Sequence, residues 1–226
     1  MIRVISMEQE ELDTILQVVE NPVRRRIIKR LSQEPAYALQ LSKELGLGQP
    51  LVAKHLAVME HAGLVSSVTE ASSAGPPRKE YSLARGVTIT MDVGPHVFLE
   101  RGMSLKPRPA AKSSEDAIQL RKMLNMALEV KDERKRLTSL SEVLSEADLR
   151  IERLESERAD LLDVRNQAMR EASGIAGNLA RVDMRRVLFH ILNEHNREVR
   201  RISEALNLRE FSVKEILEEL ERNHFG

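Results

Sequence analysis

The chain has 226 residues, of which 42% are hydrophobic, 31% charged and only 3% aromatic, and it contains no cysteine. This composition favours helices over an aromatic-lined enzyme cleft, and it excludes disulfides, thiolate zinc sites and cysteine nucleophiles. The net charge is zero, but residues 22–85 carry ten basic against five acidic side chains, a modest electrostatic footprint of the kind that nucleic-acid binding leaves.

The first predicted elements are helices. Apolar residues at helical spacing predict two short helices, one on each side of the helix-breaking pair Asn21-Pro22. A third helix is predicted over about residues 39–45 and a fourth over residues 50–61, with a glycine-marked tight turn between them. The order is therefore helix, turn, helix.

A hairpin is predicted directly after the fourth helix. In residues 64–84, "LVSSVTEASSAGPPRKEYSLA", β-forming residues flank a loop of Ser, Ala, Gly and Pro, with Arg78 and Lys79 at a basic tip. A hairpin in this place is a wing. Two further short strands are predicted at residues 87–93 and 97–100.

A long helix is predicted after a linker over residues 102–114. From residue 115 to about residue 172 there is no Pro or Gly, and apolar residues follow in alternating steps of three and four, at 137, 140, 144, 147, 151, 154 and 161. This heptad pattern predicts a dimerising coiled coil over residues 115–173, about 87 Å long if unbroken. The charged run of residues 131–136 and arginines at 158 and 165 weaken the pattern, so a break or an intramolecular hairpin is the alternative.

The last part of the chain repeats the first. A gapless shift of 161 residues aligns apolar and turn positions of the two ends, pairing 24-25 with 185-186, 27-28 with 188-189, 31 with 192, 41-42 with 202-203, 45 with 206, 47 with 208, 52 with 213 and 56 with 217. The repeat predicts a second, wingless helix-turn-helix over residues 174–226. Chance matching of helical patterns is the alternative.

The fourth helix has a face suited to the major groove of DNA. Its buried stripe is predicted to be Val52, Leu56 and Met59. The other face is small or polar, which lets a helix enter the groove, and it comprises Gln49, Pro50, Ala53, Lys54, Ala57 and His61 with His55 on the flank. Lys54 supplies charge, and Gln49 can pair with a base edge such as adenine.

The second module has a different face. The same projection buries Val213, Leu217 and Leu220 and exposes a mixed acidic set, Phe211, Lys214, Glu215, Glu218 and Arg222. Two carboxylates facing the phosphates of a groove predict that this copy does not read DNA. Dimerisation, docking on the coiled coil or binding of a partner protein are its expected roles, with phosphate contact by Arg197, Arg200 and Arg201 as the alternative.

Three stretches carry a family resemblance: "NPVRRRIIKRL", "LSKELGLGQPLVAKHLAVMEHAGLV" and "GPPRKEYSL". Over about residues 8–100 the chain resembles the ArsR-type winged helix-turn-helix regulators, especially the archaeal ones. The resemblance implies homodimeric, sequence-specific DNA binding by the second helix of the motif, with the wing on the backbone or in the minor groove. Metal-sensing members place cysteines on the helix that reads "ALQLSKELGL" here, so thiol-based metal sensing is not expected.

Several charged and histidine side chains can also be explained without a role in binding or catalysis. Arg24, Arg25 and Arg26 fit a structural role as well as a DNA-backbone contact, and Arg78 and Lys79 could simply be solvated. The histidines at 190, 195 and 224 lack the spacing of a metal site. No P-loop, dinucleotide fingerprint, nucleophile elbow or HExxH motif is present, so no catalytic residue, metal or cofactor is predicted.

The sequence thus predicts a mainly α protein with a winged helix-turn-helix (1–101), a linker (102–114), a coiled-coil dimerisation helix (115–173) and a helical module (174–226). The predicted function is a cytoplasmic, homodimeric, sequence-specific transcription regulator that binds double-stranded DNA and no membrane. Its DNA-binding residues would be Gln49, Pro50, Ala53, Lys54, His55, Arg78 and Lys79. An architectural DNA-binding protein of low specificity and a winged-helix scaffold for protein partners are the alternatives.

Overall fold

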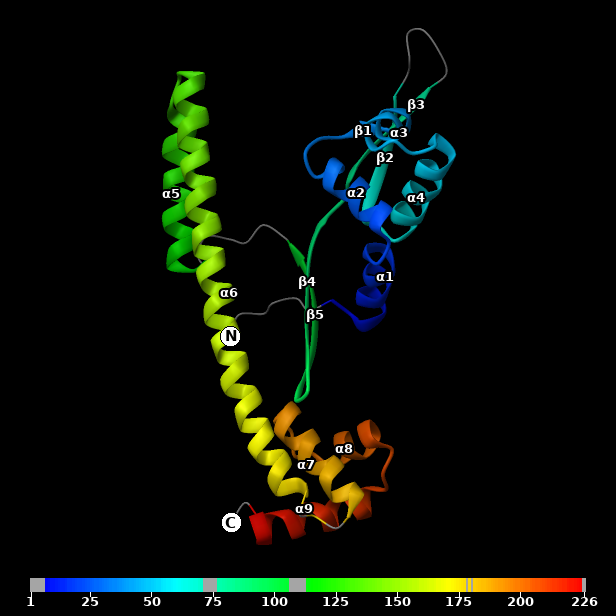
Figure 1. The fold of residues 1–226 in the computed structure, drawn as a ribbon, viewed down its shortest axis with the longest axis vertical. Helices are drawn as coiled ribbons and strands as arrows, with labels where there is room; N and C mark the ends of the chain where they lie inside the picture. Colours follow the sequence, from blue (N-terminus) through cyan, green and yellow to red (C-terminus); the bar gives the residue numbers. More distant parts are fainter. Residues whose placement is uncertain (1–6, 71–76, 106–112, 178, 180, 225–226) are drawn as a thin grey trace. The chain divides into compact units, whose positions relative to one another are not determined.

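The computed structural model describes residues 7–70, 77–105, 113–177, 179 and 181–224, shown in Figure 1. It forms two compact units, one of residues 1–93 and 98–118 and the other of residues 94–97 and 119–226. The protein is mainly helical, and the first unit has the predicted winged helix-turn-helix fold. In the part of the chain that is described, no helix is both long and apolar enough to cross a membrane.

The first unit packs four helices on a small sheet. Its helices and first strand are α1 (Gln9–Val19), α2 (Pro22–Leu31), β1 (Ala36–Tyr37), α3 (Ala38–Leu45) and α4 (Gln49–His61). The strands that follow are β2 (Val65–Glu70), β3 (Arg78–Leu83), β4 (Gly86–Gly94) and β5 (Val97–Leu105). The sheet order is β1-β3-β2, and all pairs are antiparallel. The core includes Ile15, Ile27, Leu41, Leu56 and Met59, all fully buried.

The helix boundaries follow local chemistry. Asn21 caps α2, because its side-chain oxygen accepts hydrogen bonds from the backbone N–H groups of Val23 (2.9 Å) and Arg24 (3.2 Å). Pro22 then occupies the first turn, where its missing N–H is not needed. Gly46 ends α3 with φ +65°, a left-handed conformation that glycine adopts without strain.

The wing is present, with one correction to the sequence prediction. Arg78 and Lys79 do not form the tip of the hairpin; they begin β3, where they pair with Glu70 and Thr69 of β2. The tip itself, residues 71–76, lies outside the described residues. The two basic residues therefore belong to a regular strand, and pairing with β2 holds their backbone in place.

The strands β4 and β5 form a separate two-stranded ribbon. Both predicted strands exist, but β5 continues to Leu105 and so covers the first residues of the predicted linker. The carbonyl of Gly102 accepts a hydrogen bond from the Met7 N–H (2.9 Å), and Leu105 lies against Gly86. These contacts hold the end of β5 in the first unit.

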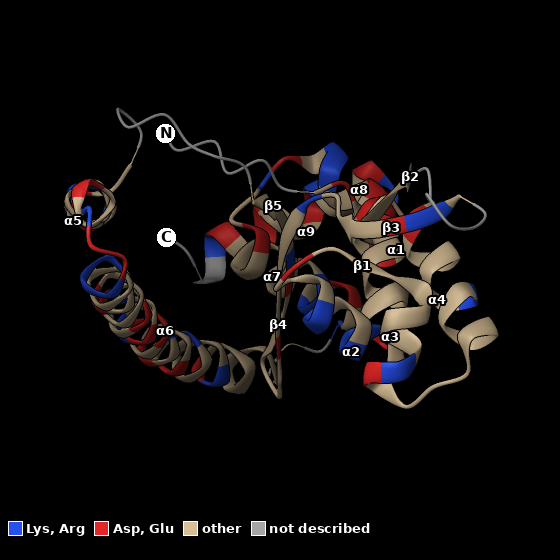
Figure 2. Ribbon diagram, turned by 90° about the horizontal axis from the view of Figure 1, so that it is seen from above, with Lys and Arg blue, Asp and Glu red and all other residues tan. Residues whose placement is uncertain are grey.

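The predicted long helix is broken. Helices α5 (Glu115–Glu129) and α6 (Glu133–Gly177) are separated by residues 130–132, and the Asp132 carboxylate caps α6 by accepting a hydrogen bond from the Lys135 N–H (2.9 Å). Helix α5 turns back and lies beside the first half of α6 (Figures 1 and 2). The observed arrangement is thus the intramolecular hairpin, which was the alternative to a single helix because of the charged run of residues 131–136.

The second unit ends in a module of three helices, α7 (Val182–Glu194), α8 (Val199–Leu206) and α9 (Glu210–His224). Helices α8 and α9 begin exactly 161 residues after α3 and α4. The turns agree in detail: Gly46 and Asn207 are both left-handed, and Ser42 and Ser203 each donate a 2.6 Å hydrogen bond to the carbonyl five residues later. The predicted internal repeat is therefore a repeat of helix-turn-helix geometry.

The packing of α9 differs from the prediction at one position. Val213 and Leu220 are buried as expected, but the third buried residue is Ile216, and Leu217 is only partly buried. Ile216 corresponds to His55 of α4 in the repeat. An isoleucine gains more from burial than an imidazole does, so α9 is turned toward Ile216.

Candidate nucleic-acid interface

The outer face of α4 is as polar and small as the sequence indicated. Val52, Leu56 and Met59 are fully buried, and His55 is partly buried. The predicted face is exposed along the helix, at Gln49, Pro50, Ala53, Lys54, Ala57 and His61, and the larger apolar side chains of Leu51 and Val58 are exposed as well. The structure thus separates the packing stripe of α4 from a face that a double helix could approach.

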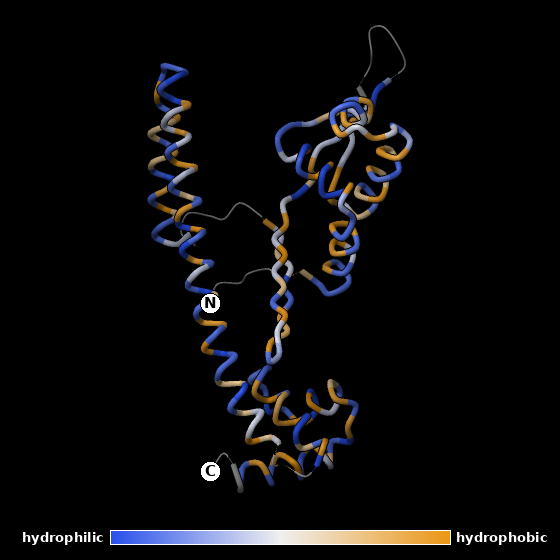
Figure 3. The backbone as a smooth tube through the Cα atoms, viewed as in Figure 1, coloured by the Kyte–Doolittle hydropathy of each residue, from blue (hydrophilic) through white to orange (hydrophobic). Residues whose placement is uncertain are grey.

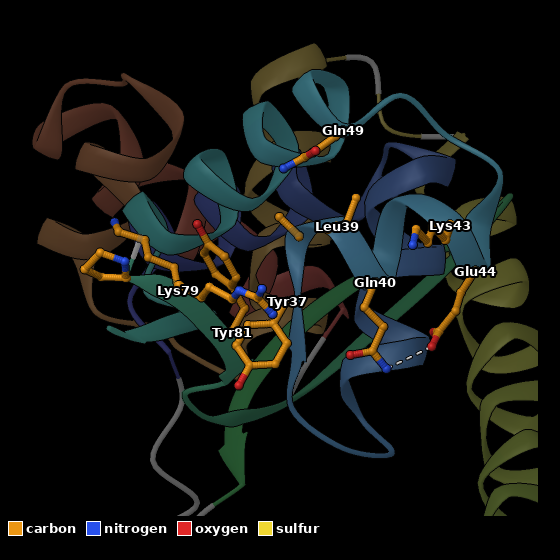
Figure 4. Close-up of a pocket in the computed structure, with 11 residues that line it drawn as sticks. Tyr37, Leu39, Gln40, Lys43, Glu44, Gln49, Lys79 and Tyr81 are labelled. Carbon is orange, nitrogen blue, oxygen red and sulfur yellow. Dashed lines mark hydrogen bonds between the residues drawn. The ribbon is translucent and has the colours of Figure 1, made fainter. Parts of the chain in front are cut away.

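A cavity of about 630 Å³ lies between α3, the first turn of α4 and β3. Figure 4 shows its lining side chains. The cavity brings together three residues predicted from the sequence, Gln49, Arg78 and Lys79. Pro50, Ala53, Lys54 and His55 do not line it; they continue along α4.

Five polar lining residues were missed by the sequence reasoning: Tyr81 of β3, and Tyr37, Gln40, Lys43 and Glu44. The last four come from the start and the outer face of α3. A helix that crosses the DNA backbone ahead of the recognition helix is part of helix-turn-helix geometry. The signal that could have found these four is the position of polar side chains on α3, once Leu41 is assigned to the core.

The arginine run at the start of α2 has a structural role. Arg24 donates hydrogen bonds to the carbonyls of Val18 (2.7 Å) and Gln17 (2.5 Å) at the end of α1. Arg25 binds the next carbonyls of α1, and Arg26 binds the Leu45 carbonyl at the end of α3 (2.7 Å). Guanidinium groups at helix C-termini satisfy carbonyls that lack partners.

Two more arginines of the basic region are paired. Arg30 binds the carboxylates of Glu44 (2.5 Å) and Glu34 (2.7 Å), and Arg85 forms an ion pair with Glu11. The local excess of basic residues therefore overstates the charge that is free to meet a ligand.

Four unpaired cations lie at the cavity and on α4. Lys43, Lys54, Arg78 and Lys79 are exposed and make no ion pair or side-chain hydrogen bond within the described residues. Three of the four line the cavity, and Lys54 lies just over one turn beyond Gln49 on α4. Lys29 on α2 and Arg101 on β5 are also exposed and unpaired within the described residues, so the cavity and α4 hold four of the free cations of the first unit and not all of them.

One acidic residue lines the same cavity, but its charge is compensated. The pKa of Glu44 is lowered by hydrogen bonds from Arg30 and from Gln40, whose amide lies 2.9 Å from the carboxylate. The Gln40 contact is drawn in Figure 4. Because Arg30 neutralises Glu44 from the α2 side, the cavity keeps a positive balance.

The surroundings of His55 disfavour its charged form. Its pKa is lowered by partial burial and by the charges of Arg24 and Lys54. A neutral imidazole donates one hydrogen bond from its protonated nitrogen and accepts one at the other nitrogen, whereas an imidazolium only donates. At neutral pH this flank of α4 therefore offers a hydrogen-bonding side chain without a charge.

The second helix-turn-helix presents the predicted acidic face. Phe211, Lys214, Glu215, Glu218 and Arg222 are all exposed on α9. Phe211 is 71% exposed and occupies the position of Pro50, and Glu215 occupies that of Lys54. Within the described residues, no group of three or more His, Asp or Glu side chains is placed to hold a metal ion in either unit.

Sequence comparison gives a match over the helix-turn-helix. Residues 21–67 match the family model of the bacterial regulatory proteins of the arsR family. An uncharacterized HTH-type transcriptional regulator of Methanocaldococcus jannaschii is 40% identical over 60 residues, which is 26% of this chain and 63% of the relative. The match therefore spans less than two thirds of that relative.

Structural comparison also finds similar chains, each matched over about a third of this chain. HlyU from Vibrio cholerae is 28% identical, with 34% of this chain and 82% of that chain covered and a TM-score of 0.31. A transcriptional regulator homologue from Pyrococcus horikoshii is 29% identical, with 33% and 76% covered and a TM-score of 0.28. The sequence match covers the segment from the Asn21 cap to the start of the wing, and for this segment it confirms the resemblance to ArsR-type regulators found in the sequence.

Proposed function

We propose that the protein is a sequence-specific, DNA-binding transcriptional regulator of the ArsR type. The observation that carries the proposal is a set of free cations on neighbouring elements. Lys43, Arg78 and Lys79 line the cavity between α3, α4 and β3, and Lys54 lies further along α4. Phosphate contacts position a protein on DNA, and side chains on a helix in the major groove read bases. The family of the helix-turn-helix supports the same function.

Each predicted residue has a role in this proposal. Gln49 and Lys54 contact base edges, while Pro50 and Ala53 allow close approach and His55 supports the flank of α4. Arg78 and Lys79 contact phosphates from β3, and Lys43 adds a contact from α3. No thiol takes part in regulation, since the chain has no cysteine.

The rest of the chain serves assembly in this proposal. Two copies associate through the region of α5 and α6, so that two α4 helices meet two half-sites on one duplex. The acidic face of α9 binds a protein partner and not DNA. Such a regulator acts in the cytoplasm, where the DNA is.

The test is selection of bound duplexes from a random pool with the purified full-length protein. We expect a short motif to be enriched. Lys54→Ala should reduce the base preference at positions of this motif, whereas Arg78→Ala should weaken binding to all sequences alike. Lys29→Ala, an exposed lysine of α2 outside the cavity, is the matched control and should change neither.

Two results would overturn the proposal. Binding without an enriched motif would indicate an architectural protein that coats DNA. No binding at all would indicate a scaffold whose winged unit serves protein partners.

A further inference from the structure

The hairpin of α5 and α6 buries little of its own surface. Among the described residues of α5, Ala127 is buried, with 3% of its surface exposed. The buried residues of α6 are Met169 and Ala176, and both lie near the C-terminal end of that helix. Helices of globular proteins depend on the packing of an apolar face for their stability. The paired part of α5 and α6 therefore needs a further partner.

The side of α6 that contacts α5 is identified by partial burial. Leu140, Val143, Ala147 and Arg150 are partly covered there, and the Arg150 guanidinium lies 3.5 Å from the side-chain oxygen of Gln119 on α5. These residues share one face of a helix with 100° between successive residues.

A second apolar stripe of α6 lies about a quarter turn from that contact. It consists of Leu137, Leu144 and Ile151, at intervals of seven residues, and all three are exposed. Figure 3 shows the apolar residues recurring along both helices of the hairpin. Packing against α5 leaves this stripe uncovered.

Helix α5 extends the same apolar face. Leu124 and Leu128 are exposed and lie about a quarter turn beyond Ala127, in the same rotational sense as the α6 stripe. Because the two helices run antiparallel, rotation in the same sense leads to the same side of the hairpin. One apolar face, here called the hairpin face, is thus formed by five side chains: Leu124, Leu128, Leu137, Leu144 and Ile151.

The charges beside the hairpin face favour a second copy in antiparallel orientation. The start of α6 is basic and its later stretch is acidic. At 100° per residue, Arg134 of the basic part and Glu152 and Glu155 of the acidic part lie on the same flank of the stripe. If two α6 helices cross at Leu144, Arg134 of one copy lies beside these two carboxylates of the other. Parallel helices would instead bring like charges together.

We propose that the hairpin face binds the hairpin face of a second copy, so that two hairpins form a four-helix bundle. The two α6 helices run antiparallel with their twofold axis at Leu144, and Leu137 of each copy meets Ile151 of the other. The proposal rests on the homodimer in the proposed function and names its contact residues. Self-complementary heptad spacing supports one identical partner over an unrelated one.

The first test is the mass of the full-length protein by sedimentation equilibrium. We expect the wild type to have twice the chain mass of 25.6 kDa and Leu144→Asp to have 25.6 kDa. Leu149→Asp is the matched control: this leucine is 59% exposed, against 65% for Leu144, but it lies on the far side of α6, so the variant should remain dimeric. Unchanged helical circular dichroism shows that both variants are folded.

The second test uses the absence of cysteine from the natural chain. Oxidised Leu144→Cys should form a covalent dimer, whereas Leu137→Cys should cross-link only when mixed with Ile151→Cys. Self-cross-linking of Leu137→Cys and of Ile151→Cys would show parallel helices and overturn the orientation. A monomeric wild type, or a dimeric Leu144→Asp, would overturn the interface.

The two proposals fail separately. If Leu144→Asp stays dimeric while the wild type selects a DNA motif, the hairpin face is wrong and the regulator stands. If the wild type dimerises through this face but binds no duplex, the interface stands and the proposed function fails.

Discussion

The two helix-turn-helix copies share a turn and differ in the face they present. Both have a left-handed residue between their helices and a serine that donates a 2.6 Å hydrogen bond to the carbonyl five residues later. Yet α4 exposes Lys54 where α9 exposes Glu215, and the partly buried His55 of α4 corresponds to the fully buried Ile216. The packing of the motif and the chemistry of its outer helix can therefore change independently.

The largest expected effect concerns what the copies share. Leu41 and Ile202 occupy equivalent, fully buried positions. We expect Leu41→Ala and Ile202→Ala each to lower the free energy of unfolding by about 2–5 kcal/mol, because each leaves a cavity. Hydrogen exchange read by mass spectrometry should locate each loss in its own copy. A loss spread equally over both units would show that the two cores do not fold separately.

The next effect concerns the difference between the outer helices. Lys54→Glu gives α4 the charge of α9 and should weaken DNA binding at least tenfold, since a carboxylate then faces the phosphates. Glu215→Lys makes the reverse change in α9 and should alter the affinity less than twofold. Fluorescence anisotropy with one labelled duplex at fixed salt measures both. Equal effects of the two substitutions would mean that both copies meet DNA.

A smaller effect concerns the shared turn. Ser42→Ala and Ser203→Ala each remove the side-chain hydrogen bond that closes the turn. We expect each to cost about 0.5–1.5 kcal/mol, the usual contribution of such a bond, and the two costs to agree. Urea unfolding followed by circular dichroism and by hydrogen exchange compares them. Unequal costs would show that the turns are alike in shape but not in energy.

The smallest effect is a pH dependence confined to the first copy. Because the pKa of His55 is lowered in the folded state, the unfolded chain binds its proton more readily. The stability of the first unit should therefore fall as the pH drops below about 6.5, the ordinary value for histidine. His55→Gln should flatten this dependence there. The second copy, which has Ile216 at this position, provides the internal comparison.

Local signals in the sequence predicted most of the helix-turn-helix. The Asn21-Pro22 cap, the glycine after α3 and the spacing of Val52, Leu56 and Met59 each act within a few residues, so their outcome can be read along the chain. Helical spacing also predicts that Leu217 is buried in α9. Spacing alone does not distinguish this position from the neighbouring Ile216, which is the one that the structure buries. Ile216 was the better core residue.

Features that depend on distant segments were predicted less well. The cavity combines Lys43 of α3 with Lys79 of β3, which only the folded unit brings together. The break before α6 had a local signal in Asp132, a good N-cap residue, but the absence of Pro and Gly from residue 115 to about residue 172 favoured a single helix. Periodicity predicts that an apolar stripe needs a partner, and it does not say which helix provides one.

The use of arginines as helix caps has a consequence for binding in salt. Each phosphate neutralised on duplex DNA releases about 0.9 counterion, so ten free cations would give a logarithmic salt dependence near −9 and four give about −4. With Arg24, Arg25 and Arg26 committed to backbone carbonyls, the winged unit belongs to the second case. Each winged unit then loses less affinity as the ionic strength rises than ten free cations would lose, so the fit of α4 in the groove carries a larger share of its binding.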